Sequence, residues 1–213
     1  MTKRKQAIVL SRRKPTQTRA RITIETIFEA TARIIERDGA GAVHTNAIAE
    51  RAGISVGTLY EYFPNKEAVL IAMARRQLAE DEQVIGKVLA EALGRPGAPL
   101  VRLVIQTLMK LFRTGPEVRR AIMTAHISSG LGAEHARPVQ EVAEILASRG
   151  DRILPERAEP IPPAALFVLT RAVIGVLRAA FEEQSSLLGR PELEDELTAL
   201  IESYLARLRT APG

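Results

Sequence analysis

The stretch AGISVGTLYEYFPNKE, Ala52 to Glu67, gathers aromatic rings in a chain that has few of them. The 213 residues include three tyrosines, five phenylalanines and no tryptophan. Three of these rings fall between Tyr60 and Phe63, directly after a run of glycine, serine and threonine. The position of each ring relative to the small residues therefore shows which side chains face a core and which face outward.

The residues from Thr45 to Phe63 fit two short helices that cross steeply at a tight turn. Crossing helices need a small side chain where they touch, and Ala49 supplies it. The turn needs a residue that adopts a left-handed backbone, and Gly53 follows four residues later. Apolar residues flank both points, namely Ile48, Ala52, Ile54, Val56 and Leu59. The set predicts a helix-turn-helix, with Thr45 as the expected N-cap of its first helix and Ser55 opening the second.

A helical wheel divides this second helix into two faces. The inward face contains Val56, Leu59 and Phe63. The outward face contains Gly57, Thr58 and Glu61, with Ser55 and Tyr62 at one border and Tyr60 at the other. A glycine inside a helix costs about 1 kcal/mol relative to alanine, so Gly57 indicates close approach of a phosphate, or else a tolerated defect. Tyr60 is either a rim residue that hydrogen-bonds a phosphate or part of the core.

The remaining sequence has helical periodicity, and no segment alternates as a strand would. Apolar residues from Ile24 to Ile35 share one face of a first helix that Gly39 ends. Asn65 is expected to cap a long charged helix, which stops at the Gly94–Pro99 break. Further helices are expected up to Thr114, from Pro116, over 139–147 and 164–181, and along the stripe of Leu193, Leu197, Leu200, Ile201, Tyr204, Leu205 and Leu208. We expect an all-α protein.

Charge is distributed unevenly along the chain. Residues 1–21 contain eight basic side chains and no acidic one, whereas the other 192 residues contain 22 basic and 25 acidic groups. Such a basic arm either solubilises the chain or binds a polyanion, which would be nucleic acid or an acidic membrane. The chain has no cysteine, and we find no signal-peptide core and no apolar run of membrane-spanning length. These features predict a soluble, cytoplasmic protein.

The segment TNAIAERAGISVGTLYEYFPNKEAVL resembles the N-terminal signature of the TetR family of transcriptional regulators, and TRARITIETIFEATARIIERDG resembles that family's first helix. The resemblance implies a three-helix DNA-binding head and a homodimer that reads a palindromic operator in double-stranded DNA. It implies DNA contacts by Thr45, Ser55, Gly57, Thr58, Tyr60, Tyr62 and Lys66. Val56 is either a further contact, packing on a thymine methyl, or part of the inward face. Glu61 either accepts from a cytosine amino group or faces solvent or Lys66.

We therefore expect three parts: a flexible basic arm over 1–18, a DNA-binding domain over 19–64, and a ligand-binding and dimerisation domain over 65–213. The helix over 164–181 is too apolar to face water on any side. We expect the last two helices, about 164–182 and 193–208, to form a four-helix seam between two copies, as the resemblance also implies.

No arrangement of residues predicts catalysis, a cofactor or a bound metal. The three histidines lack partners at metal-ligand spacing, and no nucleophile or phosphate-loop pattern occurs. We expect a ligand-responsive repressor and not an enzyme, released from DNA by a small apolar inducer. The alternative is a helical small-molecule-binding protein whose head contacts proteins. Arg171 and Arg178 serve either the dimer seam or an acidic ligand. Candidate pocket residues are Met109, Phe112, Met123, His126 and Phe167, the alternative being that all five are ordinary core.

Overall fold

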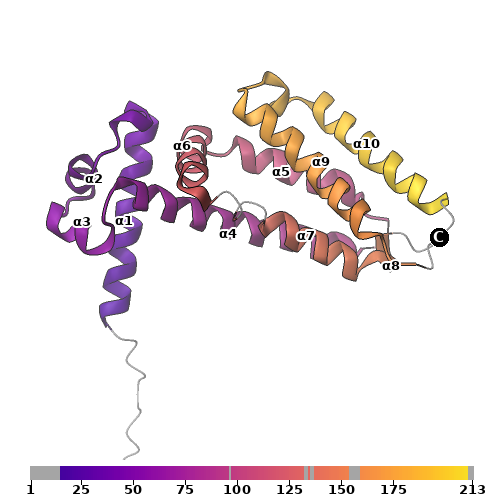
Figure 1. Cartoon of the computed structure of the whole chain (residues 1–213), viewed down its shortest axis with the longest axis horizontal. Coiled ribbons are helices and arrows are strands. Elements are labelled where there is room, and N and C mark those ends of the chain that lie inside the picture. Colours follow the sequence, from indigo (N-terminus) through magenta and orange to yellow (C-terminus); the bar gives the residue numbers. More distant parts are fainter. Residues whose placement is uncertain (1–14, 96, 132–133, 135–136, 154–158, 211–213) are drawn as a thin grey trace, which may run out of the picture. The chain divides into compact units, whose positions relative to one another are not determined.

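The computed structural model describes residues 15–95, 97–131, 134, 137–153 and 159–210. Every regular element among these residues is helical, which confirms the predicted all-α fold (Figure 1). The helices are α1 (Pro15–Asp38), α2 (Thr45–Ala52), α3 (Val56–Tyr62), α4 (Lys66–Leu93), α5 (Leu100–Arg113), α6 (Pro116–His126), α7 (Arg137–Ser148), α8 (Gly150–Ile153), α9 (Pro163–Glu182) and α10 (Pro191–Thr210). The chain divides into two compact units, which we call the head, ending at Val69, and the body, starting at Leu70.

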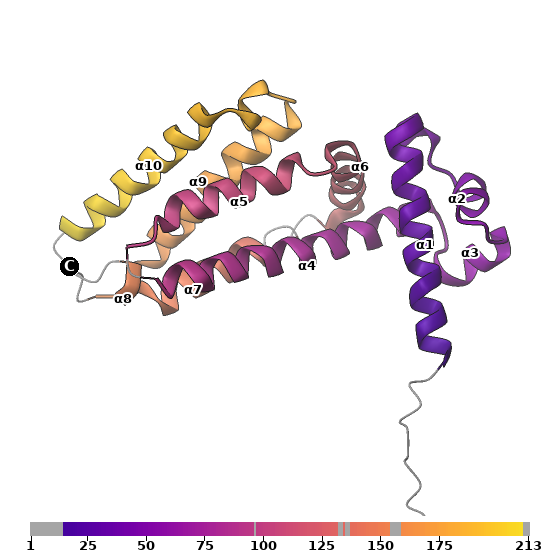
Figure 2. The same cartoon turned by 180° about the vertical axis from the view of Figure 1, so that it is seen from behind.

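The head is a three-helix unit built around one face of α1. Ile27, Ile34 and Ile35 of α1 are buried, and α1 packs against α2. Both views show α2 and α3 on the same side of α1 (Figures 1 and 2). Because α1 begins at Pro15, residues 15–18 are helical and do not belong to the expected arm. The rest of that arm, residues 1–14, lies outside the described residues.

Local capping residues set the ends of the head's helices. Asn65 Oδ1 accepts from the Ala68 N–H at 2.8 Å and so caps α4, as expected. Gly53 ends α2 with φ 68° and ψ 30°, the left-handed conformation that the turn requires. The predicted N-cap of α2 was wrong by one residue. His44, in extended conformation, precedes α2, and its Nδ1 accepts from the Ala47 N–H at 3.1 Å, so Thr45 is the first helical residue.

The body has its core where α5, α9 and α10 meet. α5 packs against both other helices, and α7 packs against α9 (Figure 1). Ile105, Leu177 and Leu197 are among the most deeply buried side chains of this cluster. Most of the predicted stripe on α10 is therefore buried against its own chain, with Leu200 as the exposed exception at 52%.

The sequence analysis found no apolar run of membrane-spanning length, and helix α9 differs from that expectation. By length and composition it could cross a membrane, since its most apolar window has a mean hydropathy of 1.8. However, Leu169, Val173 and Leu177 on one face of α9 are buried in the body. A helix from the core of a soluble protein passes the same test, so this one helix is weak evidence for a membrane span.

Candidate nucleic-acid interface and ligand cavity

Ser55 is the N-cap of helix α3, and its hydroxyl bonds to the first turn of the helix. Ser55 Oγ accepts from the Thr58 N–H at 2.9 Å and lies 2.8 Å from Thr58 Oγ1. The cap satisfies an N–H group that the first turn of a helix otherwise leaves unpaired. It also fixes two hydroxyls side by side on the outer surface of the head, because Ser55 is exposed and Thr58 is half-buried.

Gly57 follows this cap on an open surface. A Cβ atom built at Gly57 would meet only Ser55 Oγ, at 3.6 Å, which is ordinary van der Waals contact. Nothing in the chain itself therefore requires glycine at this position. The helix loses stability there without an internal packing reason, which leaves contact with an external partner or a tolerated defect as the explanation.

The aromatic residues of α3 separate into core and surface. Tyr60 is 52% exposed, so the interpretation that places it in the core is wrong. Its hydroxyl lies 3.4 Å from Thr45 Oγ1, which brings together polar groups from α2 and α3. Tyr62 is half-buried, whereas Phe63 packs on Phe28 with ring centroids 5.9 Å apart.

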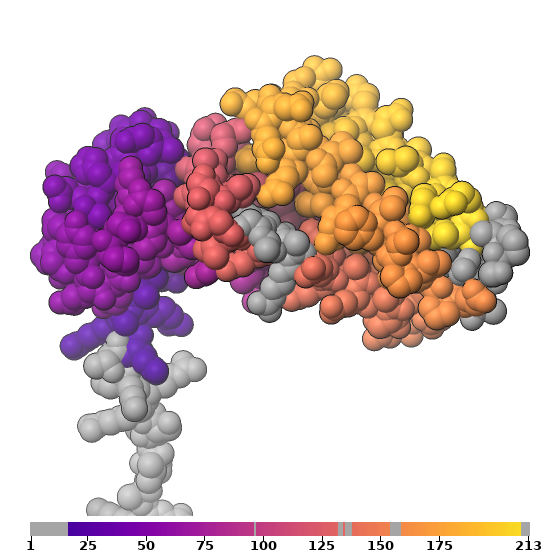
Figure 3. Space-filling model, viewed as in Figure 1, coloured from indigo at the N-terminus to yellow at the C-terminus, as the bar shows by residue number. Residues whose placement is uncertain are grey.

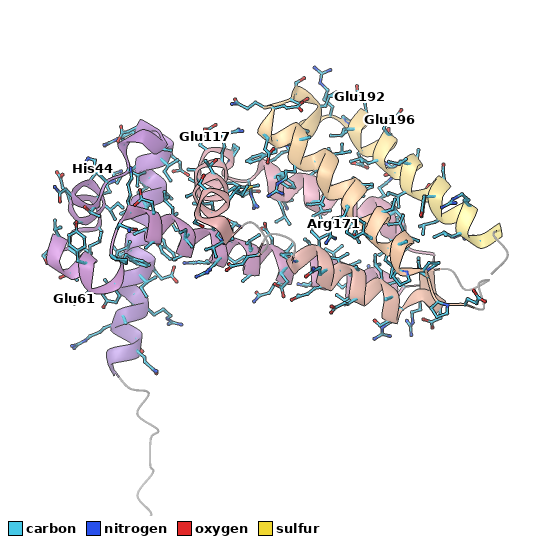
Figure 4. All side chains as sticks on the ribbon, in the orientation of Figure 1. His44, Glu61, Glu117, Arg171, Glu192 and Glu196 are labelled. Carbon is cyan, nitrogen blue, oxygen red and sulfur yellow. The ribbon has the colours of Figure 1, made fainter. Side chains whose placement is uncertain are left out.

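The remaining predicted contacts differ in exposure. Val56 is half-buried, so it is neither a full core residue nor fully available on the surface. Lys66, the first residue of α4, is also half-buried. Glu61 is exposed, as Figure 4 shows, and forms no hydrogen bond or ion pair with the part of the chain that the structure describes. The interpretation that pairs Glu61 with Lys66 is therefore not the one observed.

The body contains a cavity of about 510 Å³ that is open to the surface. Its lining comes from α4, α5, α6, α7, α9 and α10 and is mostly aliphatic, with Leu78, Val104, Ile122, Val142, Leu169 and Ile174 as examples. The surface of the body is hollowed between α6 and α9 (Figure 3). This volume lies within the range of small-molecule sites in proteins.

Two of the five predicted pocket residues line this cavity, Phe112 and Met123. Met109 is buried in the core cluster of the body and does not reach the lining. His126 is fully buried outside the lining, with Nε2 3.1 Å from Glu134 Oε2. Phe167 is 61% exposed on the outer side of α9. The sequence could not show that Phe167 lies on the outer side, because α9 is apolar on nearly every side.

A buried ion pair lines the same cavity and was missed by the sequence analysis. Arg119 of α6 donates from two nitrogens to the carboxylate of Asp81 on α4, at 2.6 and 3.1 Å. Both side chains are nearly inaccessible, with 7% and 13% of their surface exposed. Gln77 Nε2 donates to the same carboxylate at 3.0 Å. The two charges neutralise each other and tie α4 to α6 within the body.

A second link to α4 lies near the surface of the body. Arg75 donates to both oxygens of Glu134, at 2.9 and 2.8 Å. This guanidinium, together with the contact from His126, lowers the pKa of Glu134 to about 2. The carboxylate is therefore ionised at any pH near neutrality.

Comparison with known proteins assigns the chain to a family. Residues 27–73 match the model of the bacterial regulatory proteins of the tetR family, and residues 98–205, half of the chain, match the tetracyclin repressor-like C-terminal domain. The chain belongs to the TetR family. The first match covers α2 and α3, and the second covers most of the residues that line the cavity. The family is one of bacterial regulatory proteins, which is not an enzyme class.

The chain is similar in sequence to a repressor and similar in fold to solved regulators. The HTH-type transcriptional repressor KstR of Mycolicibacterium smegmatis is 32% identical over 124 residues, which are 57% of this chain and 58% of KstR. KstR of Mycobacterium tuberculosis is 30% identical over 122 residues. The match thus spans little more than half the length of these relatives. Among solved structures, a TetR-family regulator from Streptomyces coelicolor has a TM-score of 0.59 at 23% identity, covering 87% of this chain and 98% of that one. The multidrug binding protein EbrR complexed with ethidium has a TM-score of 0.63 at 18% identity, covering 85% and 97%.

Proposed function

We propose that this TetR-family protein is a ligand-responsive transcriptional repressor of the cytoplasm. In this proposal it binds a palindromic DNA operator as a homodimer and leaves it when a small molecule enters the body. The observation that carries the proposal is the exposed polar surface of α3, where an unobstructed glycine lies among hydroxyl groups. The kinship with a transcriptional repressor supports it. No catalytic step, metal or cofactor is part of the proposal.

The DNA contacts that we propose come from the hydroxyl groups, the glycine and one cation. Phosphate oxygens would accept from the hydroxyls of five side chains, Thr45, Ser55, Thr58, Tyr60 and Tyr62. Lys66 supplies a positive charge. Gly57 permits the backbone of α3 to approach the groove closely, because its surface is open. Phosphate contacts of this kind position a protein on DNA, while groove contacts specify the sequence. Val56 is the candidate for apolar contact with a thymine methyl.

The test begins with an operator selected from random duplexes, whose binding is measured by fluorescence anisotropy. Gly57→Val should abolish sequence-dependent binding, because the methyl groups of the valine would keep the backbone of α3 from approaching the groove. The matched control is Gly86→Val in the middle of α4, a second helical glycine, where a built Cβ would meet nothing within 4 Å. Full operator affinity in Gly57→Val would remove α3 from the groove. Binding that is neither salt-sensitive nor sequence-dependent would favour the alternative function, a small-molecule binder whose head contacts proteins.

The proposed dimer uses the outer faces of α9 and α10. Phe167, Val168 and Val176 of α9 and Leu200 of α10 are large apolar side chains exposed by 61%, 46%, 39% and 52%. Their exposure in a single chain supports a partner surface at this place. Leu197, by contrast, is 3% exposed, so a charge there would disturb the chain's own core and would not report on dimerisation.

Val176→Glu combined with Leu200→Glu should therefore yield folded monomers that no longer bind the operator. The control is Val84→Glu on α4. The exposure of Val84, 43%, lies between those of Val176 and Leu200, and this variant should remain dimeric. Analytical ultracentrifugation measures both. A double variant that sediments as a dimer would exclude this face as the seam.

The ligand that we propose occupies the cavity of the body. A ligand weakens operator binding only if it prefers the conformation that binds DNA poorly. Helix α4 connects the last residues of the head to the cavity as one continuous helix. It runs unbroken from Lys66 to Leu93 and contributes Leu78, Ile85 and Leu89 to the lining. A coupling of about 1–3 kcal/mol would lower operator affinity about 5- to 150-fold. Saturating operator must then weaken the ligand by the same factor, and equal ligand affinities with and without operator would rule the compound out as the inducer.

A further inference from the structure

The charged residues of the cavity lining are arranged asymmetrically. The lining contains three arginines, Arg119, Arg171 and Arg178, and a single carboxylate, Asp81. The inner pair of Arg119 and Asp81 is neutral as a unit, because two of the three guanidinium nitrogens of Arg119 donate to the carboxylate and the two charges cancel. The positive charge that remains in the lining is therefore contributed by α9.

The two arginines of α9 differ in what neutralises them. Arg178 is paired with Glu182 one turn later, its Nε lying 3.3 Å from Oε1. Arg171 contacts the Thr170 hydroxyl at 3.2 Å and lies over the Phe167 ring, 5.0 Å from its centroid. In the described part of the chain Arg171 meets no carboxylate. Figure 4 shows it on the side of α9 that faces α7 and not α10.

Arg171 lies at the rim of the cavity. It belongs to the lining, is half-buried, and stacks on a ring that is largely exposed. An anionic group held at this rim keeps part of its hydration, whereas a carboxylate taken fully into the aliphatic interior would lose it without compensation. The geometry thus combines an apolar interior with a cation where the interior meets water.

We propose that the cavity binds an aliphatic carboxylic acid, with its hydrocarbon part against the aliphatic lining and its carboxylate at Arg171. This inference rests on the proposed function only in using the same cavity. Arginine suits the role, because its planar fork donates two parallel hydrogen bonds to a carboxylate. Arg178, already paired with Glu182, contributes a weaker and longer-range attraction.

The chain length of the acid should control affinity through the area of hydrocarbon that is buried. Each added methylene should tighten binding about fourfold, until the cavity is full. The acid should also bind about ten- to a hundredfold more tightly than the alcohol of equal length, because the alcohol lacks the charge-assisted hydrogen bonds. These two trends separate a hydrophobic cavity from one with a dedicated anion site.

The competing role for Arg171 is in the dimer seam, since Phe167 beside it belongs to the exposed face of α9. A seam residue and a ligand residue respond differently to substitution. Arg171→Gln should leave the dimer intact while it removes the preference for the acid over the alcohol. Arg171→Lys keeps the positive charge and should keep most of that preference.

The experiment is isothermal titration of the full chain with octanoate, decanoate and dodecanoate, below their micelle concentrations, and with decanol. Arg171→Gln should weaken decanoate about ten- to a hundredfold and leave decanol unchanged, whereas Arg178→Gln should weaken decanoate less. Arg149→Gln is the control, an exposed arginine outside the cavity lining, and should match the unmodified protein. Equal affinities for decanoate and decanol, unchanged binding in Arg171→Gln, or a monomeric Arg171→Gln would each overturn the proposal.

The same titrations, repeated with bound operator, separate this inference from the proposed function. An acid that binds through Arg171 without weakening the operator complex would support the ligand class and contradict its role as inducer. A neutral apolar compound that releases the operator, where the acids do not bind, would support the repressor and overturn the anion site.

Discussion

Removal of the buried carboxylate of Asp81 should destabilise the body severely. Asp81→Ala leaves the guanidinium of Arg119 without its partner in a site where that side chain is 7% exposed. Breaking a buried ion pair from one side costs about 3–5 kcal/mol. For a chain of this size each kcal/mol lowers the midpoint of thermal unfolding by about 2–4 °C, so the expected shift is about 6–20 °C.

The control lies one residue earlier on the same helix. Glu80 also pairs with an arginine, Arg76, at 2.8 Å, but these side chains are 52% and 44% exposed. Glu80→Ala should therefore cost less than about 1 kcal/mol. Thermal unfolding followed by far-UV circular dichroism compares the two variants under identical conditions.

A second variant tests the physical reason and not only the size of the effect. If the cost arises from the charge left unpaired on Arg119, then replacing both partners together by leucine should recover most of the lost stability. The reasoning would be refuted if Asp81→Ala lost no more than Glu80→Ala, or if the double replacement were as unstable as the single one.

Three further predictions concern the cap, a surface link and the arm. Ser55→Ala should destabilise the head by about 1 kcal/mol, because the Thr58 N–H loses its acceptor, and urea unfolding would measure the loss. The depressed pKa of Glu134 means that its link to Arg75 contributes stability above about pH 4.5 and loses it as the pH falls toward 2. The unmodified protein should accordingly exceed Glu134→Gln in thermal midpoint at pH 5, with the gap closing at low pH; a gap independent of pH would contradict this. Deletion of residues 1–14 should flatten the salt dependence of operator binding, by about 0.9 in the log–log slope for each phosphate that the arm no longer neutralises, whereas an unchanged slope would exclude the arm from the DNA.

The head could be predicted from the sequence because its signals act over a few residues. Gly53 ends a helix by its own backbone conformation, and Ser55 and Asn65 bond to amides three residues further along. The predicted N-cap of α2, Thr45, was one residue too late. His44 and Thr45 are adjacent and both polar, and the group that accepts from the Ala47 N–H is the imidazole nitrogen of His44, a less usual cap.

The polar sites of the body could not be predicted in this way, because they join residues that are distant in sequence. Asp81 and Arg119 are 38 positions apart, and Arg75 and Glu134 are 59 apart. Periodicity identifies the helices that carry such residues but does not show which helix faces which. The same limit explains Phe167, since a helix that is apolar all round gives no indication of its outer side.

The exposed apolar face of α9 has a consequence for how sharply such a regulator would respond to its own abundance. Should two copies cover that face as proposed, the DNA-binding species forms only when two chains meet. At low concentration its amount then rises with the square of the amount of chain, by mass action. Doubling expression would quadruple the dimer, and halving expression would leave a quarter of it. The apolar surface of α9, covered in the dimer, would thus make occupancy of the operator change more steeply than the amount of chain in the cell.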